Sequence, residues 1–263
     1  MSIHSAPQIR IPATYLRGGT SKGVFFRLDD LPAPAQQPGP ARDALLLRVL
    51  GSPDPYGKQI DGMGNASSST SKAVILSRST RPGHDVDYLF GQVSIDQPFV
   101  DWSGNCGNLS AAVGPCAIHM GLIDAARIPQ DGTIPIRIWQ ANIGKTIVAH
   151  VPISNGQVQE TGDFELDGVT FAAAEVALEF MDPAEDGDDG GAISTAPGRP
   201  KLARAPSGGS EPHAVGSVGA TLMVHFQRRC SSPPCAPQCQ RSLAAGSHFA
   251  AHPPPQSQFR HRG

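Results

Sequence analysis

The sequence predicts an α+β fold in which a β-barrel-like sheet surrounds one central helix. Three observations lead to this prediction. Short strand-like segments follow one another from residue 9 to residue 180. Glycine- and proline-containing turn signals separate them. One segment of helical periodicity, directly after Cys106, carries almost no charge, so we expect it to be buried on most sides.

The strand candidates have the alternating pattern or the short apolar runs that are typical of strands. The first begins at Ile9, where apolar residues alternate with polar ones as far as Tyr15. Turns follow at RGG (17–19) and later at SNG (154–156). The further candidates are GVFFRL (23–28), AVILSR (73–78), DYLFGQVSI (87–95), PIRIWQ (135–140), KTIVAHV (145–151) and AEVALEF (174–180).

Two helices are predicted. Residues 41–51 follow a loop rich in Pro and Gly, and Gly51 provides a C-terminal cap. The second helix begins just after Cys106. Pro115 lies inside it and should kink or split it, at a cost of about 3 kcal/mol. Its apolar stripe consists of Leu109, Ala112, Val113, Cys116, Ala117 and Met120.

The chain divides into two regions of different composition. Residues 1–194 hold 22 acidic and 13 basic side chains, whereas residues 195–263 hold one acidic and 8 basic ones. We predict one intact domain over 1–193 and a low-complexity, disordered tail over 194–263, in which only residues 219–226 have a strand pattern. A frame slip in a GC-rich gene after codon 193 is one hypothesis for this switch.

Composition excludes several classes of protein. The formal net charge of −2 gives no reason to expect a nucleic-acid partner. No apolar run approaches the roughly 18 residues of a membrane helix, and no apolar signal core begins the chain. We therefore expect a cytoplasmic protein without a membrane partner. The five cysteines are odd in number and are read as free thiols.

Cys106 is the first candidate for chemistry. In DWSGNCGNLSAAVGP (101–115) it stands where a helix begins, and a helix N-terminus favours both a thiolate and a substrate carboxylate. Asn105 and Asn108 supply amide donors, and Gly107 allows a ligand close to the backbone. The alternative is a buried, inert cysteine, which is also what we expect of Cys116.

Lys72 is the second candidate. It ends a run of hydroxyl residues in DGMGNASSSTSKAVIL (61–76) and stands at the mouth of an apolar strand. A partly desolvated lysine can act as a base. The alternative is an exposed loop lysine after a flexible serine linker. The hydroxyls that could hold carboxylates or a water belong to Ser67, Ser68, Ser69, Thr70 and Ser71.

A third stretch, YLRGGTSKGVFF (15–26), contains groups suited to anions. Arg17 is a possible carboxylate clamp. Ser21 and Lys22, together with the glycines, could form an anion-binding turn. The alternative is a tight hairpin with a solvated Lys22.

Together these stretches resemble the PrpF family of 2-methylaconitate cis-trans isomerases. The resemblance rests on PATYLRGGTSKGVFF, QIDGMGNASSSTSK and DWSGNCGNLSAAVGP, and continues through QANIGKTIVAHVP and TGDFELDGVTF. It implies a fold similar to that of diaminopimelate epimerase, with two related domains, each a β-barrel-like sheet around a central helix. The active site lies in the cleft between them.

The resemblance implies that Lys72 and Cys106 are the catalytic pair. A proton is removed from a carbon conjugated with a carboxylate, the former double bond rotates in a dienolate-like intermediate, and a proton returns. No metal or organic cofactor is required. The expected carboxylate contacts are Arg17, Ser21, the hydroxyls of 67–71, Asn105, Gly107 and Asn108. A functional link to a methylcitrate dehydratase in propionate catabolism is also implied.

The resemblance ends near residues 190–193, before a second domain. A cleft site with one wall admits water, so we expect weak activity or none. Two other functions stay open: a tautomerase of oxalomesaconate type, and a non-catalytic accessory protein of a dehydratase. A third possibility is zinc binding by the tail through Cys230, Cys235 and Cys239 with His225, His248 and His252.

Overall fold

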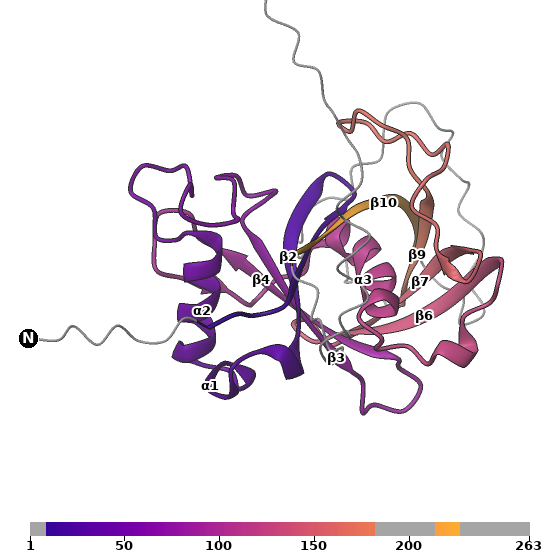
Figure 1. Cartoon of the computed structure of the whole chain (residues 1–263), viewed down its shortest axis with the longest axis horizontal. Coiled ribbons are helices and arrows are strands. Elements are labelled where there is room, and N and C mark those ends of the chain that lie inside the picture. The colour runs from indigo at the N-terminus through magenta and orange to yellow at the C-terminus, as the bar shows by residue number, and fades with distance from the viewer. Residues whose placement is uncertain (1–8, 182–213, 227–263) are drawn as a thin grey trace, which may run out of the picture. The chain divides into compact units, whose positions relative to one another are not determined.

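The computed structural model describes residues 9–181 and 214–226 (Figure 1). Every predicted strand and helix overlaps an observed one. The strands are β1 (Ala13–Gly18), β2 (Ser21–Arg27), β3 (Lys72–Arg78), β4 (Val86–Val93), β5 (Val100–Asp101), β6 (Gly132–Gln140), β7 (Lys145–Ser154), β8 (Gln157–Val158), β9 (Glu175–Met181) and β10 (Ala214–Phe226). The helices are α1 (Ala33–Gln36), α2 (Pro40–Leu50) and α3 (Gly107–His119), with 3-10 turns at Leu28–Asp30 and Ala125–Arg127.

The strands form one sheet that returns on itself. Their order is β3-β2-β1-β10-β9-β7-β6-β4-β5, and β3 also pairs with β4. Most neighbours are antiparallel, whereas β2 with β3 and β4 with β6 are parallel. The pairing of β3 with β4 closes the ring of strands, which explains why the sheet curls round a single helix.

Helix α3 is that central helix and packs against β1, β2, β6, β7, β9 and β10 (Figure 1). Nine of its residues, from Leu109 to Ala117, are buried. Its apolar side chains and the inner faces of the strands form the larger hydrophobic core. Pro115 does not split the helix, which runs through it to His119. The predicted fold class, a β-barrel-like sheet around a central helix, is therefore confirmed.

Helix α2 covers the opposite face of β2 and β3. It ends at Gly51, which has φ 79° and ψ 43° and donates its backbone N–H to Leu47, as the predicted cap requires. A second core lies between this helix and the sheet and includes Phe26, Leu46 and Ile75. Because both faces of these strands are buried, their sequences are almost continuously apolar rather than alternating. No helix within the described ranges is long and apolar enough to cross a membrane.

Strand β10 comes from the segment that was expected to be a tail. The predicted strand at 219–226 is present and begins earlier, at Ala214. It pairs antiparallel with β1 on one side and with β9 on the other. The division into 1–193 and 194–263 stays a prediction, but the backbone at 214–226 is an integral part of the sheet.

Replacement of Gly18 by alanine should destabilise the fold. An ideal Cβ at Gly18 would lie 2.5 Å from the backbone oxygen of Asn108 and 3.0 Å from the Cα of Leu109, so α3 would have to move away from β1. We expect the free energy of unfolding in urea to fall by about 1–3 kcal/mol. Gly104→Ala is the control, because nothing lies within 4 Å of its ideal Cβ, and its effect should stay within about 0.5 kcal/mol. Equal effects would contradict the close approach.

Candidate active site

Cys106 occupies the N-cap position of α3 and is 8% exposed. Its carbonyl oxygen accepts hydrogen bonds from the Ser110 backbone N–H at 3.1 Å, the Ser110 hydroxyl at 3.1 Å and the Tyr88 hydroxyl at 3.4 Å. These bonds fix the backbone of the cysteine at the end of the helix. The thiol itself points to the start of β2, where Sγ is 3.8 Å from the Ser21 Oγ.

Lys72 is the first residue of β3 and is also 8% exposed. It lies opposite Gln92 of β4, and its amine donates a hydrogen bond of 2.7 Å to the Gln92 Oε1. The same Nζ lies 5.0 Å from the centre of the Phe90 ring. The interpretation of Lys72 as an exposed loop lysine is therefore wrong: its amine is held over the sheet by a neighbouring strand.

Lys72 and Cys106 lie on the same face of the sheet. Alternate residues of a strand point to opposite faces, and Leu76, in phase with Lys72, packs in the core that contains Cys106. Phe90, beneath the lysine amine, belongs to that core as well. The sheet thus brings the amine and the thiol, 34 positions apart in the sequence, to the inner face beside the start of α3.

Gly23 allows β2 to pack closely beside Lys72 and α3. An ideal Cβ at Gly23 would lie 3.4 Å from the Lys72 Cβ and 3.0 Å from the Leu109 Cδ1 of α3. A side chain at this position would therefore have to displace Leu109 or the start of β3.

The hydroxyl run before Lys72 is divided by its own hydrogen bonds. Ser67, Ser68 and Ser69 are exposed, whereas Thr70 and Ser71 are buried. Thr70 Oγ1 lies 2.8 Å from Ser67 Oγ, so these two hydroxyls form a local pair. The Ser71 hydroxyl donates to the Val93 carbonyl oxygen and accepts from the Gln59 amide, each at 2.8 Å. Ser71 thus anchors the loop, and its hydroxyl is not brought to Lys72.

Asn105, Gly107 and Asn108 surround the thiol at the start of the helix. Asn108 is exposed, and its amide donates to the Thr20 hydroxyl at 3.2 Å, which ties the β1–β2 turn to α3. The space beside Gly107 is open. The Asn105 Oδ1 is buried and, among the described residues, has no hydrogen-bond partner. These three positions remain predicted substrate contacts.

Arg17 and Lys22 lie on the face of the sheet opposite to Ser21. Arg17 pairs with Lys22 across β1 and β2, and its guanidinium donates to the Gly19 carbonyl oxygen at 2.7 Å. Burial lowers the pKa of Arg17 from its usual value. Because Ser21 faces Cys106, its neighbour Lys22 points to the other face of the sheet. A single anion-binding turn made by both residues is therefore not what the structure forms.

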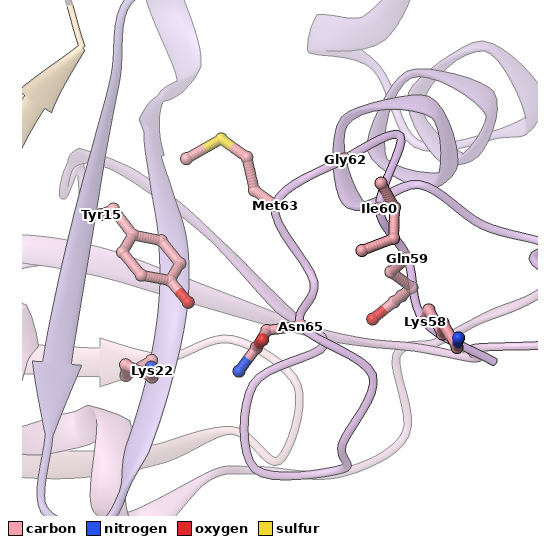
Figure 2. A pocket seen from close by; sticks show the side chains of 8 residues that line it. All are labelled: Tyr15, Lys22, Lys58, Gln59, Ile60, Gly62, Met63 and Asn65. Atoms are coloured by element: carbon pink, nitrogen blue, oxygen red, sulfur yellow. The ribbon is translucent and has the colours of Figure 1, made fainter. Parts of the chain in front are cut away.

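Lys22 instead borders a pocket of about 420 Å³ on the α2 side of the sheet (Figure 2). Its Nζ lies 5.9 Å from the centre of the Tyr15 ring. In Figure 2, Tyr15 and Lys22 from the strands face a loop that carries the other lining residues. Neither Lys72 nor Cys106 lines this pocket, which consists of Tyr15, Lys22, Lys58, Gln59, Ile60, Gly62, Met63 and Asn65.

Gln92 is the residue at this site that sequence reasoning missed. The signal was a single polar side chain in the otherwise apolar run YLFGQV, two positions from Phe90. For metals, the part of the chain that the structure describes holds no group of three or more His, Cys, Asp or Glu residues suited to an ion. The cysteines of the zinc alternative, Cys230, Cys235 and Cys239, lie outside the described residues.

Iodoacetamide should alkylate Cys106 well before Cys116 in the native chain. Cys116 is fully buried in α3, and burial raises the pKa of its thiol, which therefore stays protonated at neutral pH. We expect a rate ratio of at least about tenfold in favour of Cys106, followed by peptide mass spectrometry. Both should label alike in urea, and equal rates in the native chain would contradict the difference in environment.

Comparison with known proteins identifies the family of the chain. Residues 8–208 match the family model described as PrpF protein. The chain is 80% identical over 188 residues to the 2-methyl-aconitate isomerase of Cupriavidus necator, covering 71% of this chain and 48% of that protein. It is 49% identical over 177 residues to the 4-oxalomesaconate tautomerase of Pseudomonas putida, covering 67% and 46%.

A solved structure is similar as well. The crystal structure of a methylitaconate-delta-isomerase has a TM-score of 0.60 and 42% sequence identity, and the match covers 67% of this chain and 43% of that one. The chain spans about half the length of the curated relatives it matches. Since the family model matches most of the sequence, the chain belongs to the PrpF family.

Proposed function

We propose that this chain carries the proton-transfer site of a cofactor-independent isomerase that acts on an unsaturated tricarboxylate such as 2-methylaconitate. The observation that supports this most is the position of Lys72 and Cys106 on one face of the sheet at the start of α3. The 2-methyl-aconitate isomerase from Shewanella oneidensis, 78% identical over 184 residues, supports the choice of substrate.

Lys72 is the principal proton carrier in this proposal. Its neutral amine removes a proton from a carbon conjugated with a substrate carboxylate, and the electron pair enters the conjugated system. The former double bond becomes single and rotates. The ammonium group then returns a proton, so that the product differs from the substrate in geometry and the enzyme is unchanged. A positioned base of this kind contributes typically about 10²–10⁴-fold to the rate.

Cys106 assists from the end of the helix. The N-terminus of α3 presents backbone N–H groups and a partial positive charge, which stabilise negative charge in the dienolate-like intermediate. In this proposal the thiol acts as the acid or base partner of Lys72 across the substrate. Ser21, 4% exposed and in contact with the thiol, would orient either the thiol or a carboxylate.

The remaining carboxylates of the substrate would meet donors around the start of α3. Asn108 and Asn105 flank the thiol, and the exposed hydroxyls of Ser67, Ser68 and Ser69 precede Lys72. Arg17 is the cross-strand partner of Lys22 and so lies on the face of the sheet opposite to Ser21. It is therefore the least supported of the proposed substrate contacts. The expected methylcitrate dehydratase would supply the substrate, because removal of water from a hydroxy acid creates the double bond.

A second candidate substrate is oxalomesaconate. The 49% identical tautomerase of Pseudomonas putida supports it, because tautomerisation uses the same removal and return of a proton. The higher identity to the 2-methyl-aconitate isomerases favours 2-methylaconitate. Rates for the two substrates, measured side by side, decide between them.

Lys72→Ala should abolish proton exchange with the substrate. We expect incorporation of solvent deuterium into 2-methylaconitate, followed by NMR, to fall at least about 100-fold relative to the unmodified chain, because the proton carrier is gone. Cys106→Ala should also slow it. Lys58→Ala is the matched control, since Lys58 is exposed on the α2 side, and it should exchange normally. Undiminished exchange in Lys72→Ala would refute the proposed function.

A further inference from the structure

Gln92 holds the lysine amine through a side chain that is itself fixed. Its Oε1 accepts the hydrogen bond from the Lys72 Nζ at 2.7 Å. Its Nε2 donates to the Ser71 carbonyl oxygen at 2.9 Å. The second bond settles which end of the amide faces the lysine, since only the nitrogen can donate to a carbonyl. Gln92 therefore presents an acceptor, and never a donor, to the amine.

This clamp is built into the register of the sheet. Lys72 and Gln92 are direct cross-strand partners in the antiparallel pair β3–β4, so both side chains stand on the α3 face. Ser71, whose carbonyl oxygen accepts the hydrogen bond from the Gln92 amide, is fully buried. Its hydroxyl is hydrogen-bonded to Val93 and Gln59. The amide that accepts the lysine hydrogen bond is thus itself bonded to a fully buried residue.

We propose that Gln92 is a positioning residue for Lys72: it aims the amine at the substrate, and as an uncharged acceptor it lets the amine gain and lose its proton. This inference rests on the proposed function, in which Lys72 carries the proton. An amide oxygen accepts a hydrogen bond from an ammonium group and from a neutral amine, and it favours the ammonium form less than a charged acceptor does. A carboxylate at the same place would favour the ammonium form and take the base out of use.

Among the described residues around Lys72, Gln92 is the one that accepts a hydrogen bond from the amine, and the other neighbours are of different chemistry. On β2 the residues that face α3, Ser21, Gly23 and Phe25, do not titrate. On β4 the Phe90 ring lies under the amine, with its centre 5.0 Å from Nζ. Tyr88 follows, and burial raises the pKa of its hydroxyl well above the usual value, so it stays neutral.

Two further titratable groups share this face. Cys106 lies at the start of α3. Asp101 of β5 pairs with Gln92 on the far side of β4, and hydrogen bonds from the Ser103 hydroxyl and backbone N–H lower the pKa of its carboxyl. The Asp101 carboxylate therefore lies one strand further from Lys72 than Gln92 does, and it is hydrogen-bonded to Ser103. The group in direct contact with Nζ is the neutral amide.

Competitive labelling with acetic anhydride tests the proposal without any need for activity. The full chain is labelled across a pH series, and acetylation of Lys72 is quantified by peptide mass spectrometry. In Gln92→Glu the pH of half-maximal labelling should rise by about one unit, which is a tenfold loss of labelling below that pH. In Gln92→Met, which has nearly the same length but no strong acceptor, it should fall, because burial then disfavours the cation.

Gln97→Glu is the matched control, because it adds the same charge at an exposed position, and it should leave Lys72 unchanged. Opposite shifts in the two Gln92 variants support the positioning role, whereas general loosening would move both in one direction. No shift, shifts of the same sign, or loss of the native melting transition in both variants would overturn it. Failure of the proposed function would appear separately, as substrate exchange that survives Lys72→Ala.

Discussion

Helix α3 lies inside the ring of strands because small residues line the contact between them, and the rest of the structure depends on this close packing. An ideal Cβ at Gly114 would lie 2.7 Å from the Val151 Cγ2, and one at Gly18 would lie 2.5 Å from the Asn108 backbone oxygen. The strands can therefore approach the helix backbone at both places. This packing fixes where α3 begins relative to the strands, and therefore where the thiol at its N-cap lies.

The same packing explains why the site combines burial with polarity. The start of α3 faces the first residues of β2 and β3, Ser21 and Lys72, where the apolar inner core ends. Three of the polar groups there are tied to the scaffold: the thiol to Ser21, the amine to Gln92 and the amide of Gln92 to Ser71. Burying a polar group without such a partner costs stability, so the hydrogen bonds that orient these groups also offset the free-energy cost of burying them.

Much of this arrangement could be predicted from local sequence, and some of it could not. The strands, the Gly51 cap and the helix that starts after Cys106 follow from periodicity and capping residues close together in the chain. The partnership of Lys72 with Gln92 depends on the register between two strands, which neighbouring residues do not encode. The separation of Ser21 from Lys22 depends on where β2 begins, and a shift of one residue would exchange their faces.

The place of β10 has a consequence for the behaviour of this chain in solution. The match to the family model ends at residue 208, yet the backbone of Ala214–Phe226 joins β1 to β9. Without it, both strands would present rows of unpaired N–H and C=O groups, which are templates for pairing with another molecule. Because β10 occupies this place, the facing edges of β1 and β9 are covered and do not offer themselves to another molecule.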